Sequence, residues 1–287
     1  MQGYPLPLRR PGREAAATIA SVLPLRDRNP TLRTPWVTIG LIAANVLIFV
    51  LWQPTFGSEG ERDAFYYCHA LVPYEVTHGT DLADGGVPAR EAISRRLGNR
   101  ESGPDLQRFL LRACASKQPY LPLLVAMFLH GGWLHLAGNM LFLWVFGNNV
   151  EDRLGRPLYL GFYLVGGLAA SALQIAFGPN SVVPSVGASG AIAAILGAYL
   201  VMYPRARILA LMFFISPVEL PAAVVLGSWF VLQLFSGVGG IGDALNTGVA
   251  YWAHVGSFLA GVVMTYLLYP RGRARVPAFR PPPRPDF

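Results

Sequence analysis

The chain has 287 residues, of which 53% are hydrophobic and only 14% are charged, and its formal net charge is +7. Soluble domains are about a quarter charged, so this composition excludes an ordinary soluble domain and indicates an integral membrane protein in a lipid bilayer. The basic residues are divided between two tails and one loop and form no patch on a soluble domain, so we expect no nucleic-acid partner.

The apolar runs are long enough to cross a bilayer as helices of about 20 residues, which favours helices over barrel strands. Six runs are predicted to span, at residues 36–52, 133–151, 158–177, 187–203, 219–235 and 249–269. A short apolar segment at 208–215, interpreted as re-entering the membrane without crossing it, precedes the fifth run. Residues 119–132 are interpreted as a stretch that leads to the second run without spanning the membrane. The predicted fold class is an all-α membrane protein, a six-transmembrane-helix bundle with a long extracytoplasmic loop between helices 1 and 2.

The predicted domain organisation has a membrane domain between two tails. Residues 1–35 form a basic, proline-containing cytoplasmic tail, and residues 270–287 form a disordered cytoplasmic tail rich in arginine and proline. The membrane domain is 36–269. Inside it, the stretch 53–118 is too polar to span and too long for a turn, so we expect an extramembrane loop with some helix, including an amphipathic patch at 90–97.

Orientation follows from the loop charges. Six spans place both termini on one side, together with the arginine-containing loops 151–157 and 204–207, whereas loops 178–186 and 236–248 contain no lysine or arginine. The positive-inside rule then makes both termini cytoplasmic. No cleavable apolar core follows the first arginines, so we expect the first span to be an uncleaved anchor. A composition rich in alanine, glycine, arginine and proline favours a bacterial source, hence a multi-pass protein of the cell (inner or plasma) membrane.

Both cysteines, Cys68 and Cys114, lie in the long loop. Two cysteines in an oxidising compartment can form a disulfide, and the alternative is two free thiols. The sequence leaves both possibilities open.

Reactive polar residues recur at one depth of the predicted bundle. His135 and Asn139 lie near the start of the second span, Ser189 near the start of the fourth and His254 near the start of the sixth. These three helices all begin on the loop side, and at 1.5 Å per residue each group lies within roughly 10 Å of its helix end. The spacing of His135 and Asn139 places them on one helix face.

Two stripes of small residues predict which helices approach closely. One stripe follows Ser189 along the fourth span (Ser189, Ala193 and Gly197), and the other follows the sixth span beside His254 (Ala253, Ser257 and Gly261). Small residues four apart allow membrane helices to pack tightly. If these two faces meet, Ser189 and His254 become neighbours.

Such a pair has recognisable chemistry. A serine hydroxyl becomes a nucleophile when a base takes its proton, and histidine is suited to this task near neutral pH. The Ser189 backbone N–H at the helix start has no partner within the helix. With His135 and Asn139 as side-chain donors, it could stabilise an oxyanion. No aspartate or glutamate lies near this layer in helices two, four or six, so we predict a Ser-His dyad.

Simpler interpretations exist for each residue. Ser189 could be only a helix cap or a packing residue, because serine is common in both roles. Residues 187–191 also do not match the G-x-S-x-G elbow of hydrolases, since position 191 is alanine. Asn139 could join helices, and His254 could relay protons. His130 and His135 could bind metal or haem, but their separation is not a helical pair and no companion motif exists, so we expect no metal and no cofactor. The run 151–153 is interpreted as structural.

The chain resembles the rhomboid intramembrane serine proteases. The resemblance covers about 36–269 and rests on the motifs HGGWLHLAGNM (130–140), GASG (187–190) and AH (253–254) with Gly256 and Gly261. It implies that Ser189 is the nucleophile and His254 the general base. It also implies an oxyanion hole formed by His135, Asn139 and the Ser189 backbone N–H. The implied activity is cleavage of transmembrane segments of other membrane proteins, without a metal or cofactor, with lateral entry past the fifth segment and a cap at 236–248.

Two positions depart from the family pattern. Ala193 stands where an aromatic residue often stacks on the base, and Ser257 stands where a glycine is often found. Both changes concern the orientation of the His254 ring. A catalytically weak or inactive relative that binds transmembrane clients is the alternative function, and a transporter or channel is a third, although no inverted repeat or paired acidic residues support it. The natural substrate, cleavage site and oligomeric state cannot be read from the sequence.

Overall fold

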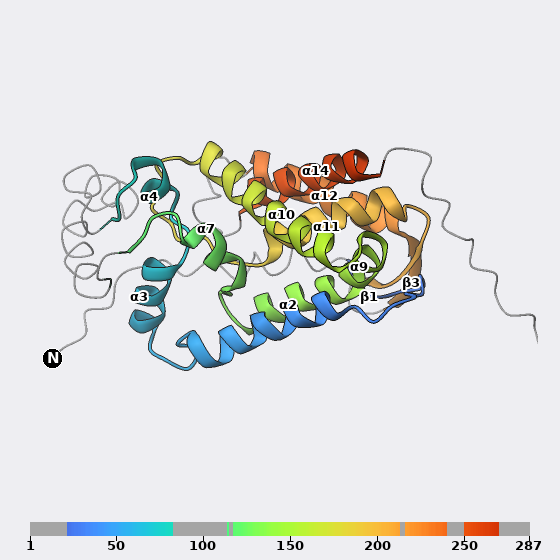
Figure 1. Ribbon diagram of the computed structural model, residues 1–287, viewed down its shortest axis with the longest axis horizontal. Coiled ribbons are helices and arrows are strands. Elements are labelled where there is room, and N and C mark those ends of the chain that lie inside the picture. Colours follow the sequence, from blue (N-terminus) through green and yellow to red (C-terminus); the bar gives the residue numbers. More distant parts are fainter. Residues whose placement is uncertain (1–21, 83–113, 115–116, 213–215, 240–249, 270–287) are drawn as a thin grey trace, which may run out of the picture.

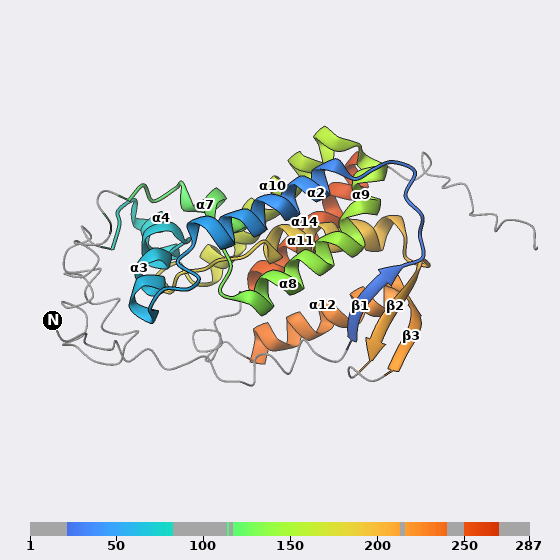
Figure 2. The same ribbon diagram turned by 90° about the horizontal axis from the view of Figure 1, so that it is seen from below.

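The computed structural model describes residues 22–82, 114, 117–212, 216–239 and 250–269. Long helices lie side by side in the middle of an elongated molecule. Two short helices, α3 (Glu59–His69) and α4 (Pro73–His78), lie at one end, and a small sheet lies at the other (Figures 1 and 2). The tails 1–21 and 270–287, the predicted patch 90–97 and the glycines of 240–248 lie outside the described residues.

The predicted apolar runs correspond to helices. They are α2 (Trp36–Leu47) with a π-helical turn (Ile48–Trp52), α8 (Trp133–Phe142) with a second such turn (Leu143–Gly147) and α9 (Asn148–Leu154), then α10 (Arg156–Phe177), α11 (Ser189–Met202), α12 (Ala222–Gly239) and α14 (Tyr251–Leu268). Within the described residues, α10 and α14 are long and apolar enough to cross a membrane, and Trp36–Trp52, Ser189–Met202 and Ala222–Gly237 are shorter apolar helical stretches. The count of six spans therefore stays a prediction.

Helix α11 lies at the centre of the core. All its residues from Gly190 to Tyr199 are buried, and α10 and α14 pack against it. A Cβ atom at Gly261 of α14 would overlap the Ala194 backbone of α11, and one at Gly197 would overlap the Phe258 carbonyl. The close packing of α11 and α14 that the small-residue stripes predict is therefore confirmed.

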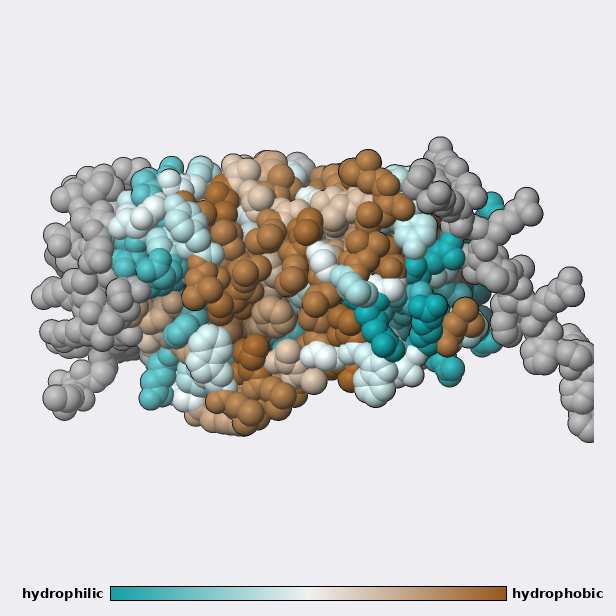
Figure 3. Space-filling view, viewed as in Figure 1, coloured by the Kyte–Doolittle hydropathy of each residue, from teal (hydrophilic) through white to brown (hydrophobic). Residues whose placement is uncertain are grey.

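The surface around this core carries an apolar band. Figure 3 shows hydrophobic side chains gathered over the middle of the molecule, with hydrophilic residues toward both ends. Exposed apolar residues on the longest helices contribute to the apolar surface, among them Val165 and Leu168 of α10 and Val263 and Leu267 of α14. An exposed apolar surface of this kind suits contact with lipid rather than water.

The described chain is mostly helical, as predicted, but it is not all-α, because three antiparallel strands form a sheet. Their order is β1 (Val22–Asp27), β2 (Arg207–Met212) and β3 (Ser216–Pro221), as Figure 2 shows. The predicted re-entry at 208–215 therefore contains a strand, the predicted tail 1–35 contributes another, and α12 begins at Ala222 instead of 219. A short apolar run does not distinguish strand from helix, and the burial of Ile208 and Ala210 on alternate positions is what a strand needs.

One carboxylate holds the start of α2. Glu151 is buried and accepts hydrogen bonds from the Val37 N–H (3.0 Å), the Thr38 N–H (2.7 Å) and the Thr38 hydroxyl (2.8 Å). The first N–H groups of a helix lack partners within the helix, and a negative charge there also suits the helix dipole. The run 151–153, interpreted from the sequence as structural, thus joins α9 to α2.

The described part of the long loop forms a compact lobe, here called the α3–α4 lobe (residues 59–82 with Cys114 and Lys117). A disulfide joins Cys68 and Cys114, whose Cα atoms are 5.3 Å apart, so the structure has the bridge that the sequence left open. The Lys117 ammonium lies 2.6 Å from the Glu75 carboxylate, and both side chains are at least 96% buried. Lys117 also donates to the Tyr67 and Ala70 carbonyls, so the chain after Cys114 is tied to α3.

Candidate active site

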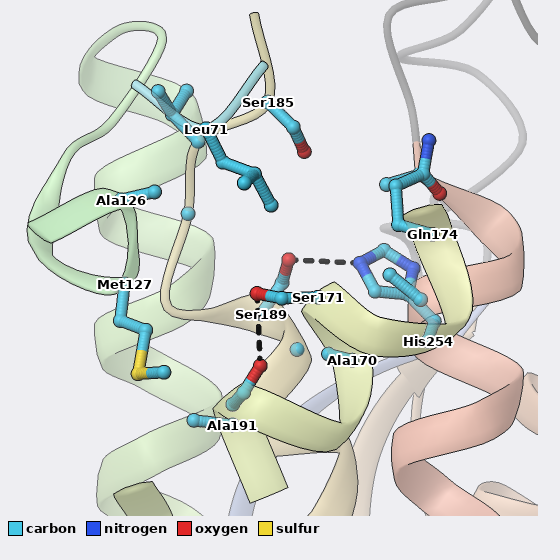
Figure 4. A pocket seen from close by; sticks show the side chains of 16 residues that line it. Leu71, Ala126, Met127, Ala170, Ser171, Gln174, Ser185, Ser189, Ala191 and His254 are labelled. Atoms are coloured by element: carbon cyan, nitrogen blue, oxygen red, sulfur yellow. Dashed lines mark hydrogen bonds between the residues drawn. The ribbon is translucent and has the colours of Figure 1, made fainter. Parts of the chain in front are cut away.

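Ser189 is the first residue of α11 and faces His254 of α14. The Ser189 Oγ atom lies 2.8 Å from the His254 Nε2 atom, as the dashed line in Figure 4 shows. The two residues are 65 positions apart in the chain, and the tight approach of α11 and α14 brings them together. A hydroxyl at this distance can donate its proton to an imidazole nitrogen.

The turn before Ser189 requires a glycine. Gly187 has a φ of 134°, which side chains rarely adopt, and a Cβ atom there would lie 3.0 Å from His135 Nε2. The Gly187 N–H donates to the Ala126 carbonyl at 2.9 Å. Gly187, which has no side chain, therefore lets the His135 ring pack against the turn next to Ser189.

The loop that leads to this turn is paired with the α3–α4 lobe. Leu71 and Ser185 exchange two backbone hydrogen bonds, of 3.2 and 2.7 Å. The Tyr74 N–H donates to the Ser181 carbonyl at 3.0 Å, and the Thr77 hydroxyl donates to the Pro179 carbonyl at 2.8 Å. The lobe therefore positions the segment that carries the nucleophile candidate.

His135 and Asn139, the predicted side-chain donors, both lie on α8 (Trp133–Phe142). The Gly131 N–H donates to His135 Nδ1 at 3.2 Å, so in the neutral ring the proton lies on Nε2, the nitrogen that faces Gly187. One turn later, Asn139 is buried, and its Nδ2 group has no hydrogen-bond partner among the described residues. The structure thus brings the His135 ring against the turn that precedes Ser189, because a Cβ atom at Gly187 would lie 3.0 Å from His135 Nε2 and 3.4 Å from Ser189 Oγ.

His130 is fully buried next to this cluster. Its ring lies edge-on to the His135 ring at a centroid distance of 5.2 Å, and neither ring nitrogen has a partner in the part of the chain that the structure describes. In the same described ranges, no three His, Cys, Asp or Glu side chains are grouped as metal ligands.

The second nitrogen of the base has a partner that the sequence did not reveal. His254 Nδ1 lies 2.8 Å from the Gln233 Oε1 atom of α12, and the Trp229 ring of the same helix lies 5.9 Å from the His254 ring, centroid to centroid. Gln233 is the one amide side chain in the predicted span 219–235. Because a polar residue is costly in a membrane helix, that isolated amide is the signal that could have found it.

Ser257, at the position where the family pattern has a glycine, is fully buried. Its hydroxyl lies 2.8 Å from the Gly166 carbonyl of α10 and also contacts the Gly190 carbonyl of α11. The serine thus adds hydrogen bonds across the three packed helices without separating them. Ala193 is also fully buried, and it leaves the His254 ring without an aromatic neighbour from α11.

A cavity of about 40 Å³ lies beside Ser189, which has room for about two or three water molecules. It lies between the helix pair α10–α11, the start of α14 and the 185–187 segment (Figure 4). Its lining includes polar side chains (Ser171, Gln174, Ser185, Ser189 and His254). The cavity therefore has room for water beside Ser189 and His254.

Comparison with known proteins gives one family. Residues 117–271, more than half of the chain, match the family model of the Rhomboid domain. The chain is 34% identical over 111 residues to presenilin-associated rhomboid-like protein A, mitochondrial, of Danio rerio, covering 37% of this chain and 29% of that protein. It is 30% identical over 169 residues to Rhomboid protein 1, mitochondrial, of Saccharomyces cerevisiae, covering 56% and 46%.

A third relative covers more of both chains. RHOMBOID-like protein 6, mitochondrial, of Arabidopsis thaliana is 28% identical over 257 residues, which are 85% of this chain and 72% of that protein. By contrast, the matched region is less than half the length of the fish and yeast proteins.

The predicted location in the cell (inner or plasma) membrane, with cytoplasmic termini, is contradicted by these relatives, which are named as mitochondrial proteins. The charge rule used for the prediction compares the two sides of a membrane and does not identify which membrane it is. A composition rich in alanine, glycine, arginine and proline likewise does not specify the compartment.

Proposed function

The chain belongs to the rhomboid family, and from this premise we propose that it is an intramembrane serine endopeptidase that cleaves transmembrane segments of other membrane proteins. The observation that carries the proposal is the 2.8 Å contact between Ser189 Oγ and His254 Nε2 beside a cavity with room for water. A capping or packing serine needs no histidine at this distance. The proposed partners are transmembrane protein substrates and the lipid bilayer.

The proposed reaction begins at the Ser189 hydroxyl. Its Oγ attacks the scissile carbonyl carbon while its proton passes to His254 Nε2. The resulting oxyanion accepts hydrogen bonds from the Ser189 backbone N–H, the His135 Nε2–H and the Asn139 amide. When the C–N bond breaks, His254 returns the proton to the leaving amine. A water molecule, deprotonated by the same nitrogen, then hydrolyses the acyl ester and regenerates Ser189.

We also propose that six segments cross the bilayer: α2 with its π-helical turn, α8 through α9, α10, α11, α12 and α14. The 14 residues of α11 rise about 21 Å, which is less than the roughly 30 Å thickness of a hydrocarbon core. In this arrangement Ser189 lies below the membrane surface, and the α3–α4 lobe lies above it. Peptide hydrolysis at that depth depends on the cavity for its water.

The experiment that tests the function uses a fluorophosphonate probe and a reporter transmembrane substrate on the purified full chain. Wild type should label and cleave, and Ser189→Ala should do neither. His254→Ala should lose cleavage while it keeps a wild-type melting temperature. Labelling that survives Ser189→Ala would overturn the assignment of the nucleophile. An unlabelled wild type that still binds the reporter would favour an inactive, client-binding relative.

A further inference from the structure

Two contacts to the His254 ring from outside the proposed dyad come from one helix, α12, in the part of the chain that the structure describes. Gln233 and Trp229 lie one turn apart on the same face of α12. Gln233 is only 6% exposed, although its neighbours Leu232 and Leu234 point to the surface at 40% and 37%. The amide therefore faces into the protein, toward the base.

The Gln233 contact decides which nitrogen of the base carries the proton. In the structure the Gln233 Oε1 atom faces Nδ1 at 2.8 Å, and because an amide oxygen only accepts, this amide orientation corresponds to a ring with its proton on Nδ1. The neutral ring then has its lone pair on Nε2, which is the form that can take the Ser189 proton. The opposite tautomer would present an N–H to Ser189 and could not act as a base.

The Trp229 contact compensates for a missing neighbour. On α11 the position one turn after Ser189 is Ala193, whose methyl group offers no ring to the imidazole. On α12 the Trp229 ring lies 5.9 Å from the His254 ring and 6.1 Å from the Phe258 ring, at similar tilts. An aromatic ring thus lies beside His254, but α12 supplies it instead of α11.

We propose that Gln233 is a positioning residue that fixes the tautomer and orientation of His254, with Trp229 as its aromatic support, so that α12 completes the Ser189–His254 pair. This inference rests on the proposed function. A displacement of α12 from α14 would remove both contacts at once and leave the base free to rotate. The lateral position of α12 and the reactivity of Ser189 are therefore coupled.

The test compares three variants of the full-length chain in detergent micelles. Gln233→Met keeps the side-chain length but removes the acceptor, and Gln233→Glu restores an acceptor. Ser228→Ala is the matched control on the same helix, because among the described residues the Ser228 hydroxyl bonds only to the Val225 carbonyl one turn before it. The readouts are kcat and KM on the reporter substrate across pH, the melting temperature and the ¹⁵N chemical shifts of the histidine rings.

Gln233→Met should lower kcat by about 10- to 100-fold with KM within about twofold, because part of the contribution of general base catalysis is lost. Gln233→Glu should recover most of kcat and move the low-pH limb of the kcat/KM profile to higher pH, because a carboxylate stabilises the imidazolium. The other titratable group that acts on His254 among the described residues is His135, which all variants retain. Ser228→Ala should match wild type.

The ¹⁵N spectrum separates this inference from the proposed function. In wild type the His254 signal should be that of a ring protonated at Nδ1, and Gln233→Met should give a mixture of tautomers, whether or not the chain cleaves a substrate. A wild-type ring protonated at Nε2, or an unchanged kcat in Gln233→Met, would overturn the positioning role. If Gln233→Met does not fold, Trp229→Leu should also lower kcat, and an unchanged kcat there would count against α12.

Discussion

Leu71 and Ser185 are joined by two backbone hydrogen bonds, of 3.2 and 2.7 Å, four residues before Ser189. This short antiparallel bridge is the contact between the α3–α4 lobe and the 179–185 segment that lies nearest in sequence to the proposed nucleophile; Tyr74 and Thr77 of the lobe bind the same segment further upstream. The lobe is not part of the long-helix bundle, yet it helps to position the segment that leads to Ser189. The disulfide within the lobe is the first place to test that dependence.

Removing the disulfide with Cys68→Ser and Cys114→Ser should lower the free energy of unfolding by about 2–4 kcal/mol, because the bridge closes a loop with a sequence separation of 46 residues. Thermal unfolding with and without a reducing agent measures the effect. Reductant should lower the melting temperature of wild type and leave that of the double variant unchanged. If reductant has no effect on wild type, the bridge does not contribute to stability.

Gly187→Ala should reduce cleavage and fluorophosphonate labelling at least 10-fold. A methyl group there has to adopt a φ of 134° and would press on the His135 ring at 3.0 Å, so the ring or the turn must shift. The control is Gly178→Ala in the same loop, where φ is −143° and a Cβ atom would make ordinary contacts of 3.6 Å or more. Equal activity of the two variants would show that the turn tolerates a side chain.

Glu151→Ala should cost about 2–4 kcal/mol of folding stability, because it leaves the Val37 and Thr38 N–H groups and the Thr38 hydroxyl without their acceptor. Chemical denaturation in micelles provides the measurement. Asp152→Ala is a comparison on the same turn, since that carboxylate accepts only an exposed bond from the Leu32 N–H among those described. Asp152→Ala should lower the free energy of unfolding clearly less than Glu151→Ala does. A larger loss in Asp152→Ala would contradict the capping role of Glu151.

Asp27 should make stability depend on pH. Burial raises the pKa of the Asp27 carboxyl to about 6, against the lowering effects of the Tyr199 hydroxyl and Arg26. A folded-state pKa above the unfolded value means that its stabilising contribution is full below about pH 4 and is lost as the pH rises through 6.

The measurement for Asp27 is the melting temperature between pH 4 and 7. Wild type should lose stability relative to Asp27→Asn over this range, because asparagine keeps the shape but does not titrate. Parallel pH profiles for the two proteins would show that Asp27 has the same proton affinity in the folded and unfolded states.

The approximate helix positions could be predicted from the sequence, because they follow from local apolar runs and the fixed rise of a helix. The neighbouring positions of Ser189 and His254 followed from the small-residue stripes. Gln233 was missed, although it is the one amide in the run 219–235, because the sequence does not indicate that this face of α12 turns toward His254 of α14. The sheet was missed because β1 pairs with a strand far along the chain, and only the tertiary fold joins 22–27 to 207–212.

The sheet also changes where the folded domain begins. A chain that began at residue 36, where the first apolar run starts, would lack β1. The edge of β2 that pairs with β1, where Ala210 lies opposite Pro24, would then be unpaired. Unpaired strand edges recruit other chains, so such a truncated protein should be prone to self-association in solution. It would also lose the Asp27 carboxylate that bonds to Asn149 and Tyr199 at 2.6 and 2.7 Å. Anyone preparing this protein for biochemistry should retain the chain from Val22 onward.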